Sequence, residues 1–177
     1  GVEDATLAVV KGAVEAVVAL AGHRMAETDP ELGANLMVFF FRDWAELPEV
    51  PNLDRLVPGL AALCARLEEA GANQYRIFRF DPEGAIRAVF VFVRMDAHLE
   101  VVSAETLALS QAVQMILLWS DRAFGEMSPL AAGPGGEVML RPEIAALIRA
   151  GYDPVLPAMA MDATHGLRLA ARIARVV

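Results

Sequence analysis

The residues best suited to chemistry form a narrow polar line in the strongly apolar stretch 106–120. Thr106, Ser110 and Gln114 follow one another at four-residue steps, and Gln111 stands beside them. On a helix this spacing places the side chains along one face. Uncharged hydroxyls and amides in apolar surroundings either bond to neighbouring strands and loops or face a cleft. The sequence leaves both interpretations open.

The helix that carries this line is expected to be central in the fold. Its other residues are nearly all apolar around the whole circumference, from Leu107 to Trp119, and a helix that is apolar on all sides is buried. We predict that it begins after Ser103, a favourable N-cap residue. It is expected to run from Ala104 to about Phe124, with Trp119 in the core.

The surrounding segments predict an α+β fold, with helices packed on a small, mainly antiparallel or mixed sheet of about three to five strands. Apolar periodicity predicts helices over 4–24, 60–70 and 143–150, and a last helix that opens at Asp162. Apolar and β-prone runs predict strands over 36–41, 75–80 and 85–94, the last two joined in a hairpin by Asp81-Pro82-Glu83-Gly84. Residues 125–140 contain four glycines and two prolines and predict a surface connection. We expect residues 1–177 to form a single domain.

Composition argues against several classes of function. The chain has 177 residues, 56% of them hydrophobic, and its 15 basic and 23 acidic residues give a formal net charge of −8. This balance argues against nucleic acid and anionic membranes as partners. The charge-free stretch 106–120 is shorter than the about 20 apolar residues of a transmembrane helix. The single cysteine, Cys64, excludes an intrachain disulfide and a cysteine-built zinc site, and we expect a buried thiol.

The histidines and the glycine-rich segment give no sign of a catalytic or cofactor site. His23, His98 and His165 are scattered and lack a partner at a four-residue step, so we predict no metal site. The segment Gly133-Pro134-Gly135-Gly136 lacks the lysine and hydroxyl residue that end a phosphate-binding loop. The sequence therefore predicts no cofactor and no identifiable catalytic residue.

Two features near the C-terminus predict local structure or a contact surface. Asp153, which precedes Pro154, is expected to shape a turn after Tyr152. A stripe on the last helix consists of Arg168, Arg172 and Arg175. The stripe is either a solvated face or a surface that docks an acidic partner.

The C-terminal third carries a family resemblance. The segment Arg149-Ala150-Gly151-Tyr152-Asp153-Pro154-Val155-Leu156 is followed by methionines and an alanine-rich helix. This arrangement is similar to the end of a proteobacterial family of secreted or lipoprotein-like domains of unknown function. The stretch 140–152 also resembles the helix that follows the active site in matrixin-like zinc peptidases. The resemblance implies a zincin-like scaffold, a periplasmic, secreted or lipid-anchored location, and a leader that precedes Gly1.

The same resemblance places the polar line where zinc peptidases carry His-Glu-x-x-His. The matching positions read Ser110-Gln111-Ala112-Val113-Gln114, and Ser120 stands at the third ligand position. Serine and glutamine are poor zinc ligands, and a neutral amide takes no proton from water.

We therefore expect a non-catalytic binding or interaction domain with a protein or small-molecule partner and no assigned oligomeric state. The alternatives are a hydrolase with a site beside the central helix, or an assembly component. The candidate cleft residues are Thr106, Ser110, Gln111, Gln114, Ser120 and Tyr152.

Overall fold

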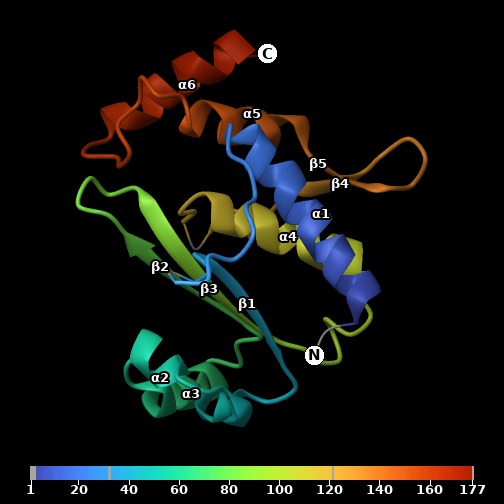
Figure 1. Cartoon of the computed structure of the whole chain (residues 1–177). Coiled ribbons are helices and arrows are strands. Elements are labelled where there is room, and N and C mark those ends of the chain that lie inside the picture. The colour runs from blue at the N-terminus through green and yellow to red at the C-terminus, as the bar shows by residue number, and fades with distance from the viewer. Residues whose placement is uncertain (1–2, 32, 121, 177) are drawn as a thin grey trace. The chain divides into compact units, whose positions relative to one another are not determined.

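The computed structural model describes residues 3–31, 33–120 and 122–176, and it confirms the α+β class (Figure 1). In chain order the elements are α1 (Asp4–Leu20), β1 (Leu36–Phe41), the 3-10 helix η1 (Trp44–Glu49), α2 (Leu53–Leu56), α3 (Leu60–Glu69), β2 (Gln74–Phe80), β3 (Ile86–Arg94), α4 (Ala104–Ile116), β4 (Leu130–Ala132), β5 (Val138–Leu140), α5 (Pro142–Gly151) and α6 (Thr164–Val176). Among the described residues, no helix is both long and apolar enough to cross a bilayer.

The chain divides into two compact units, each built from segments that are distant in sequence. One unit comprises Gly1–Gly33, Phe80–Ile86 and Ser103–Val177, and the other comprises Ala34–Arg79 and Arg87–Val102.

A three-stranded mixed sheet forms the centre of the unit built from residues 34–79 and 87–102. Its strand order is β1-β3-β2 (Figure 1). β1 pairs in parallel with β3, from Leu36 opposite Val89 to Phe41 opposite Arg94, and β2 and β3 form the predicted hairpin. At the turn, the Asp81 carboxylate accepts hydrogen bonds from the backbone N–H groups of Glu83 and Ala85, at 3.0 and 2.8 Å. The local turn signal in the sequence was therefore sufficient to predict this pairing.

One face of this sheet packs on η1, α2 and α3 around Trp44. The Trp44 side chain is 0% exposed, and its indole N–H donates to the carbonyl of Ala72 at 2.8 Å. The thiol of Cys64 is buried in the same cluster and donates to the carbonyl of Trp44 at 3.2 Å. Burial, together with the nearby negative charge of Glu68, raises the pKa of Cys64. The buried thiol that the sequence predicted is therefore confirmed, and its surroundings disfavour the nucleophilic thiolate form.

In the other unit, α1 runs alongside α4 (Figure 1). Val14 and Val17 of α1 are buried, as are Leu107 and Val113 of α4. The buried residues of α1 follow the apolar periodicity that the sequence predicted for this helix, and burial of apolar surface of this kind is the main stabilising contribution to a helix pair.

The helix α4 is shorter than predicted. The Ser103 N-cap is confirmed, but the helix ends at Ile116 because Leu117 has an extended backbone, with φ −133° and ψ 155°. Trp119 therefore lies beyond the helix and is partly exposed rather than in the core. Its indole N–H donates to the carbonyl of Val113 at 2.8 Å, which occupies a carbonyl near the helix end.

The stretch 125–140 also differs from the expected surface connection. It contains a short hairpin, in which Leu130 pairs with Leu140 and Ala132 with Val138. The turn closes because Gly136 takes a positive φ of 86° and the Glu137 carboxylate accepts from the backbone N–H of Gly135 at 2.9 Å. The glycines predicted the turn, but strands of three residues are too short to show a period.

Candidate functional site

Polar side chains on α4 form hydrogen bonds with one another and with the N-cap residue of the helix. The hydroxyl of Ser103 donates to the hydroxyl of Thr106 at 2.8 Å and accepts from the Thr106 N–H at 3.2 Å. The side-chain amide of Gln114 donates to the hydroxyl of Ser110 at 3.1 Å and to its carbonyl at 3.3 Å. Gln111 is only 3% exposed. Thr106, Ser110 and Gln114 thus form hydrogen bonds within α4 and with its N-cap residue.

Tyr152 is brought to the C-terminal end of α4. It follows α5, and its hydroxyl donates to the carbonyl of Ile116, the last residue of α4. Its ring meets the His23 ring edge-on, with centroids 5.0 Å apart. Burial raises the pKa of Tyr152 above its ordinary value of 10.0. The phenol therefore stays protonated at neutral pH and donates its hydrogen to a carbonyl at the end of α4.

Ser120 does not join this group. It is exposed and lies beyond the end of α4, where its carbonyl accepts from the Ala123 N–H at 3.0 Å. Among the residues that the structure describes, no three His, Cys, Asp or Glu side chains are placed to hold a metal ion. Of the six predicted cleft residues, three are hydrogen-bonded within α4 or to its N-cap, Gln111 is buried on the same helix, Tyr152 caps its end, and Ser120 is exposed.

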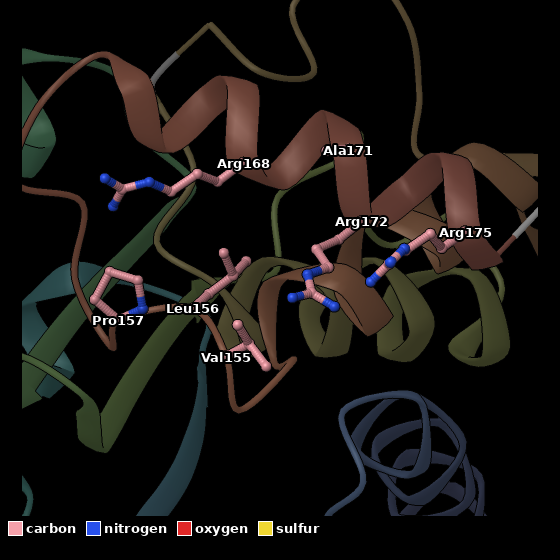
Figure 2. A pocket seen from close by; sticks show the side chains of 7 residues that line it. All are labelled: Val155, Leu156, Pro157, Arg168, Ala171, Arg172 and Arg175. Atoms are coloured by element: carbon pink, nitrogen blue, oxygen red, sulfur yellow. The ribbon is translucent and has the colours of Figure 1, made fainter.

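A surface hollow lies instead between α6 and the segment that follows Pro154. It has a volume of about 410 Å³ and is lined by Val155, Leu156, Pro157, Arg168, Ala171, Arg172 and Arg175. The predicted arginine stripe therefore forms one wall of this hollow, and three apolar side chains form the other (Figure 2). The spacing of the arginines was visible in the sequence, whereas the opposite wall was not.

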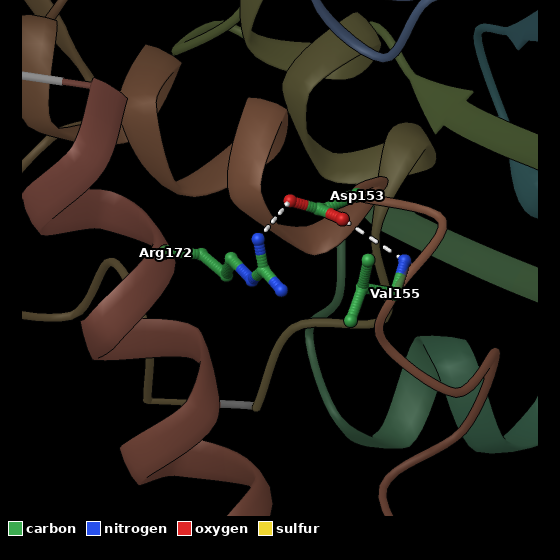
Figure 3. A network of polar contacts seen from close by, with 3 residues as sticks. All are labelled: Asp153, Val155 and Arg172. Carbon is green, nitrogen blue, oxygen red and sulfur yellow. Dashed lines mark hydrogen bonds and ion pairs between the residues drawn. The ribbon is translucent and has the colours of Figure 1, made fainter.

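One of the three arginines is held in place by an ion pair. A guanidinium nitrogen of Arg172 lies 3.2 Å from the Oδ2 atom of Asp153, and the Oδ1 atom of Asp153 accepts from the Val155 N–H at 2.9 Å. Figure 3 shows that a single carboxylate links the helix to the loop. The turn that Asp153 was predicted to shape is confirmed, and the same side chain also orients Arg172.

The other two arginines keep their charge available to a ligand. Arg168 and Arg175 are exposed, and in the part of the chain that the structure describes their side chains form no ion pair or hydrogen bond. The pKa of Asp162 is lowered chiefly by hydrogen bonds from Thr164, and the charge of Arg168 adds to this effect. The hollow is therefore a positively charged surface on a chain whose net charge is −8.

No protein-family model, curated protein or solved structure matches this chain. The chain is an α+β protein with an arginine-lined hollow beside its C-terminal helix. Two unpaired guanidinium groups on one helix, opposite an apolar wall, suit a ligand that carries carboxylates and at least one apolar group.

Proposed function

We propose that this chain is a non-catalytic binding domain that recognises an acidic, extended segment of a partner protein in the hollow beside α6. The observation that carries the proposal is the convergence of Arg168, Arg172 and Arg175 on one hollow in an acidic chain. Clustered arginines that oppose the net charge attract a carboxylate-rich partner and bind it through forked hydrogen bonds.

The spacing of the arginines indicates the form of the partner. Arg172 contacts Asp153 through one guanidinium nitrogen, so its other N–H groups remain available to a ligand. On a helix with a rise of about 1.5 Å per residue, it is displaced from Arg168 by about 6 Å along the axis. An extended chain advances about 3.3 Å per residue, so carboxylates at alternate positions are about 6.6 Å apart on the same side. Val155 and Leu156, on the opposite wall, would accept an apolar side chain. We therefore propose a segment with acidic residues at alternate positions and an apolar residue nearby.

The alternative, a hydrolase with a site beside α4, has less support. Gln114 and Ser110 are bonded to each other, and the Tyr152 hydroxyl is bonded to a backbone carbonyl. Hydrolysis would need a positioned base or nucleophile that is free to react. The zincin-like origin and the exported location implied by residues 149–156 belong to the proposal. Elemental analysis of the purified protein and a full-length reading frame would test them, and stoichiometric zinc would contradict a non-catalytic scaffold.

Binding to a labelled peptide with glutamates at alternate positions tests the proposed partner. We expect the double variant Arg168→Ala with Arg175→Ala to weaken binding about tenfold, because each lost ion pair contributes about 0.7 kcal/mol at an exposed site. Binding should also weaken as salt concentration rises. Arg149→Ala is the matched control, since Arg149 is an exposed arginine on α5 that does not line the hollow.

The peptide with glutamine in place of glutamate is the second control. A loss of binding free energy per removed arginine that is the same for Arg149→Ala and for the double variant would show that only net charge is sensed. The absence of any binding by the unmodified chain would remove the proposed partner class.

A further inference from the structure

The strand β1 is an outer strand of the three-stranded sheet. The order β1-β3-β2 places β3 in the middle, and within residues 3–31, 33–120 and 122–176 no strand pairs with the other side of β1. All six residues of β1 are apolar, with no charge, proline or glycine. Natural sheets usually protect such an edge because unpaired backbone groups bind further strands.

The parallel pairing with β3 determines which backbone groups of β1 face outward. The Val89 N–H donates to the carbonyl of Asn35 at 2.9 Å, and the Met95 N–H donates to the carbonyl of Phe41 at 2.8 Å. Both acceptors are odd-numbered residues. Because successive residues of a strand direct their N–H and C=O groups to opposite sides, the even-numbered residues Leu36, Val38 and Phe40 direct theirs away from β3.

These outward groups have no partner in the described parts of the chain. No backbone hydrogen bond is formed there by Leu36, Val38 or Phe40, although their side chains are partly buried. The opposite edge strand, β2, carries Arg76 and Arg79, and charged residues of this kind oppose the addition of a further strand. The unprotected edge of the sheet is therefore β1.

We propose that β1 pairs antiparallel with β1 of a second copy of this chain, so that Val38 lies opposite the partner's Val38. In this register Leu36 lies opposite the partner's Phe40, and Phe40 lies opposite the partner's Leu36. The register engages every outward-facing residue of both strands, and each of the three pairs exchanges about two hydrogen bonds. Any other antiparallel register leaves at least one outward residue of each strand unpaired.

The charge pattern favours a second copy as the occupant. The outward residues Leu36 and Phe40 lie two positions on either side of Val38, and all three are uncharged. Two identical strands can therefore pair without bringing like charges together. The first charged residues, Arg42 and Asp43, would lie opposite the partner's Ala34 and the partner's Gly33, so like charges do not face each other. A net charge of −8 on each copy opposes association at long range.

This balance predicts a weak dimer that salt strengthens. A pair of six-residue strands buries less surface than a stable interface requires, so we expect a reversible dimer at concentrations on the order of 100 μM. Salt screens the repulsion between the two acidic chains and should raise the dimer fraction. The acidic-peptide binding proposed above should respond to salt in the opposite direction, so either proposal can fail without the other.

Amide hydrogen exchange measured by NMR at about 20 μM and about 1 mM tests the register directly. With a dissociation constant on the order of 100 μM, about a fifth of the chains remain monomeric at the higher concentration. At about 20 μM about three quarters of the chains are monomeric, so the amides of Leu36, Val38 and Phe40 should exchange about fourfold more slowly at the higher concentration. The amides of Met37, Phe39 and Phe41, which face β3, should exchange equally at both concentrations. Equal rates for the outward amides would overturn the proposal.

Sedimentation equilibrium of two variants at one position provides an independent test. Val38→Pro removes the outward N–H at the centre of the register, and proline is tolerated on an edge strand where the N–H faces solvent. We expect it to weaken dimerisation at least tenfold, while Val38→Thr, which keeps the N–H and a β-branched side chain, stays within about twofold.

Circular dichroism checks that the proline variant is folded; if it is not, the exchange measurement decides alone. A concentration-independent monomer mass for the unmodified chain would refute the dimer. Undiminished dimerisation of a folded Val38→Pro variant would place the contact on another surface. Outward amides that are protected in a monomer would mean that the chain covers its own edge.

Discussion

Replacement of Trp44 by alanine should be far more destabilising than the same replacement at Trp119. Trp44 is 0% exposed and donates its indole N–H to Ala72 at 2.8 Å. A buried tryptophan removes about 200 Å² from water, which at about 25 cal/mol per Å² contributes at most about 5 kcal/mol. The replacement also leaves a cavity and an unpaired carbonyl at Ala72. We expect Trp44→Ala to lower the free energy of unfolding by about 4 kcal/mol.

Trp119 provides the matched comparison. It is partly exposed, donates to the Val113 carbonyl and packs against Phe124 with ring centroids 4.9 Å apart. Its removal opens a space that water can enter, so no closed cavity adds to the lost contacts. We expect Trp119→Ala to cost about 2 kcal/mol.

Chemical denaturation followed by intrinsic fluorescence and circular dichroism measures both values. The chain contains two tryptophans, so each variant retains a single fluorescent reporter. Coincident transitions by the two methods are required before either free energy is interpreted as a two-state value. A Trp119→Ala variant as unstable as Trp44→Ala would refute the packing described here and place Trp119 in a core. A loss of less than 1 kcal/mol for Trp44→Ala would refute the position of Trp44.

Two further substitutions test the contacts near the C-terminus. Tyr152→Phe should cost about 1–2 kcal/mol in urea denaturation because the Ile116 carbonyl loses its donor. Since burial raises the pKa of Tyr152, the unfolded chain releases the phenolic proton first. Stability should therefore fall as the pH rises above 10, and the phenylalanine variant should lack this part of the decline; an unchanged pH dependence would contradict it. Asp153→Asn should lower the free energy of unfolding by less than about 1 kcal/mol in the same urea denaturation. Its ion pair with Arg172 is partly exposed, and the amide oxygen can still accept from the Val155 N–H. A larger loss would mean that the ion pair holds α6 in place.

Elements with a strong local signal were predictable from the sequence. The strand 36–41 was correct to the residue because six consecutive apolar residues of this kind suit a strand covered on both faces. The β2–β3 hairpin was predicted because Pro82 and Gly84 favour a tight turn and Asp81 accepts from the turn backbone. The start of α4 was predicted because Ser103 caps its own helix, an interaction between near neighbours in the chain.

Features that depend on distant residues were not predictable in this way. The end of α4 was misplaced because its final carbonyls are bonded by Trp119 and by Tyr152, and the latter is 36 residues from Ile116. The polar line lies on α4 as predicted, and of its candidate partners Tyr152 reaches the helix only in the folded chain. The hollow beside α6 was missed because the segment 155–157 is brought opposite the arginines only when the chain folds.

The sequence by itself determined the α+β composition, the strands β1, β2 and β3, the starts of α1, α3 and α4, and the spacing of the arginines. Each of these follows from side-chain periodicity or from hydrogen bonds between residues a few positions apart. Tertiary structure alone decided that Tyr152 donates to the last carbonyl of α4, that Asp153 orients Arg172, and that the arginine stripe lines a hollow. The physical reason is that a polar side chain takes its role from the partner it meets, and such partners are often contributed by remote segments of the chain.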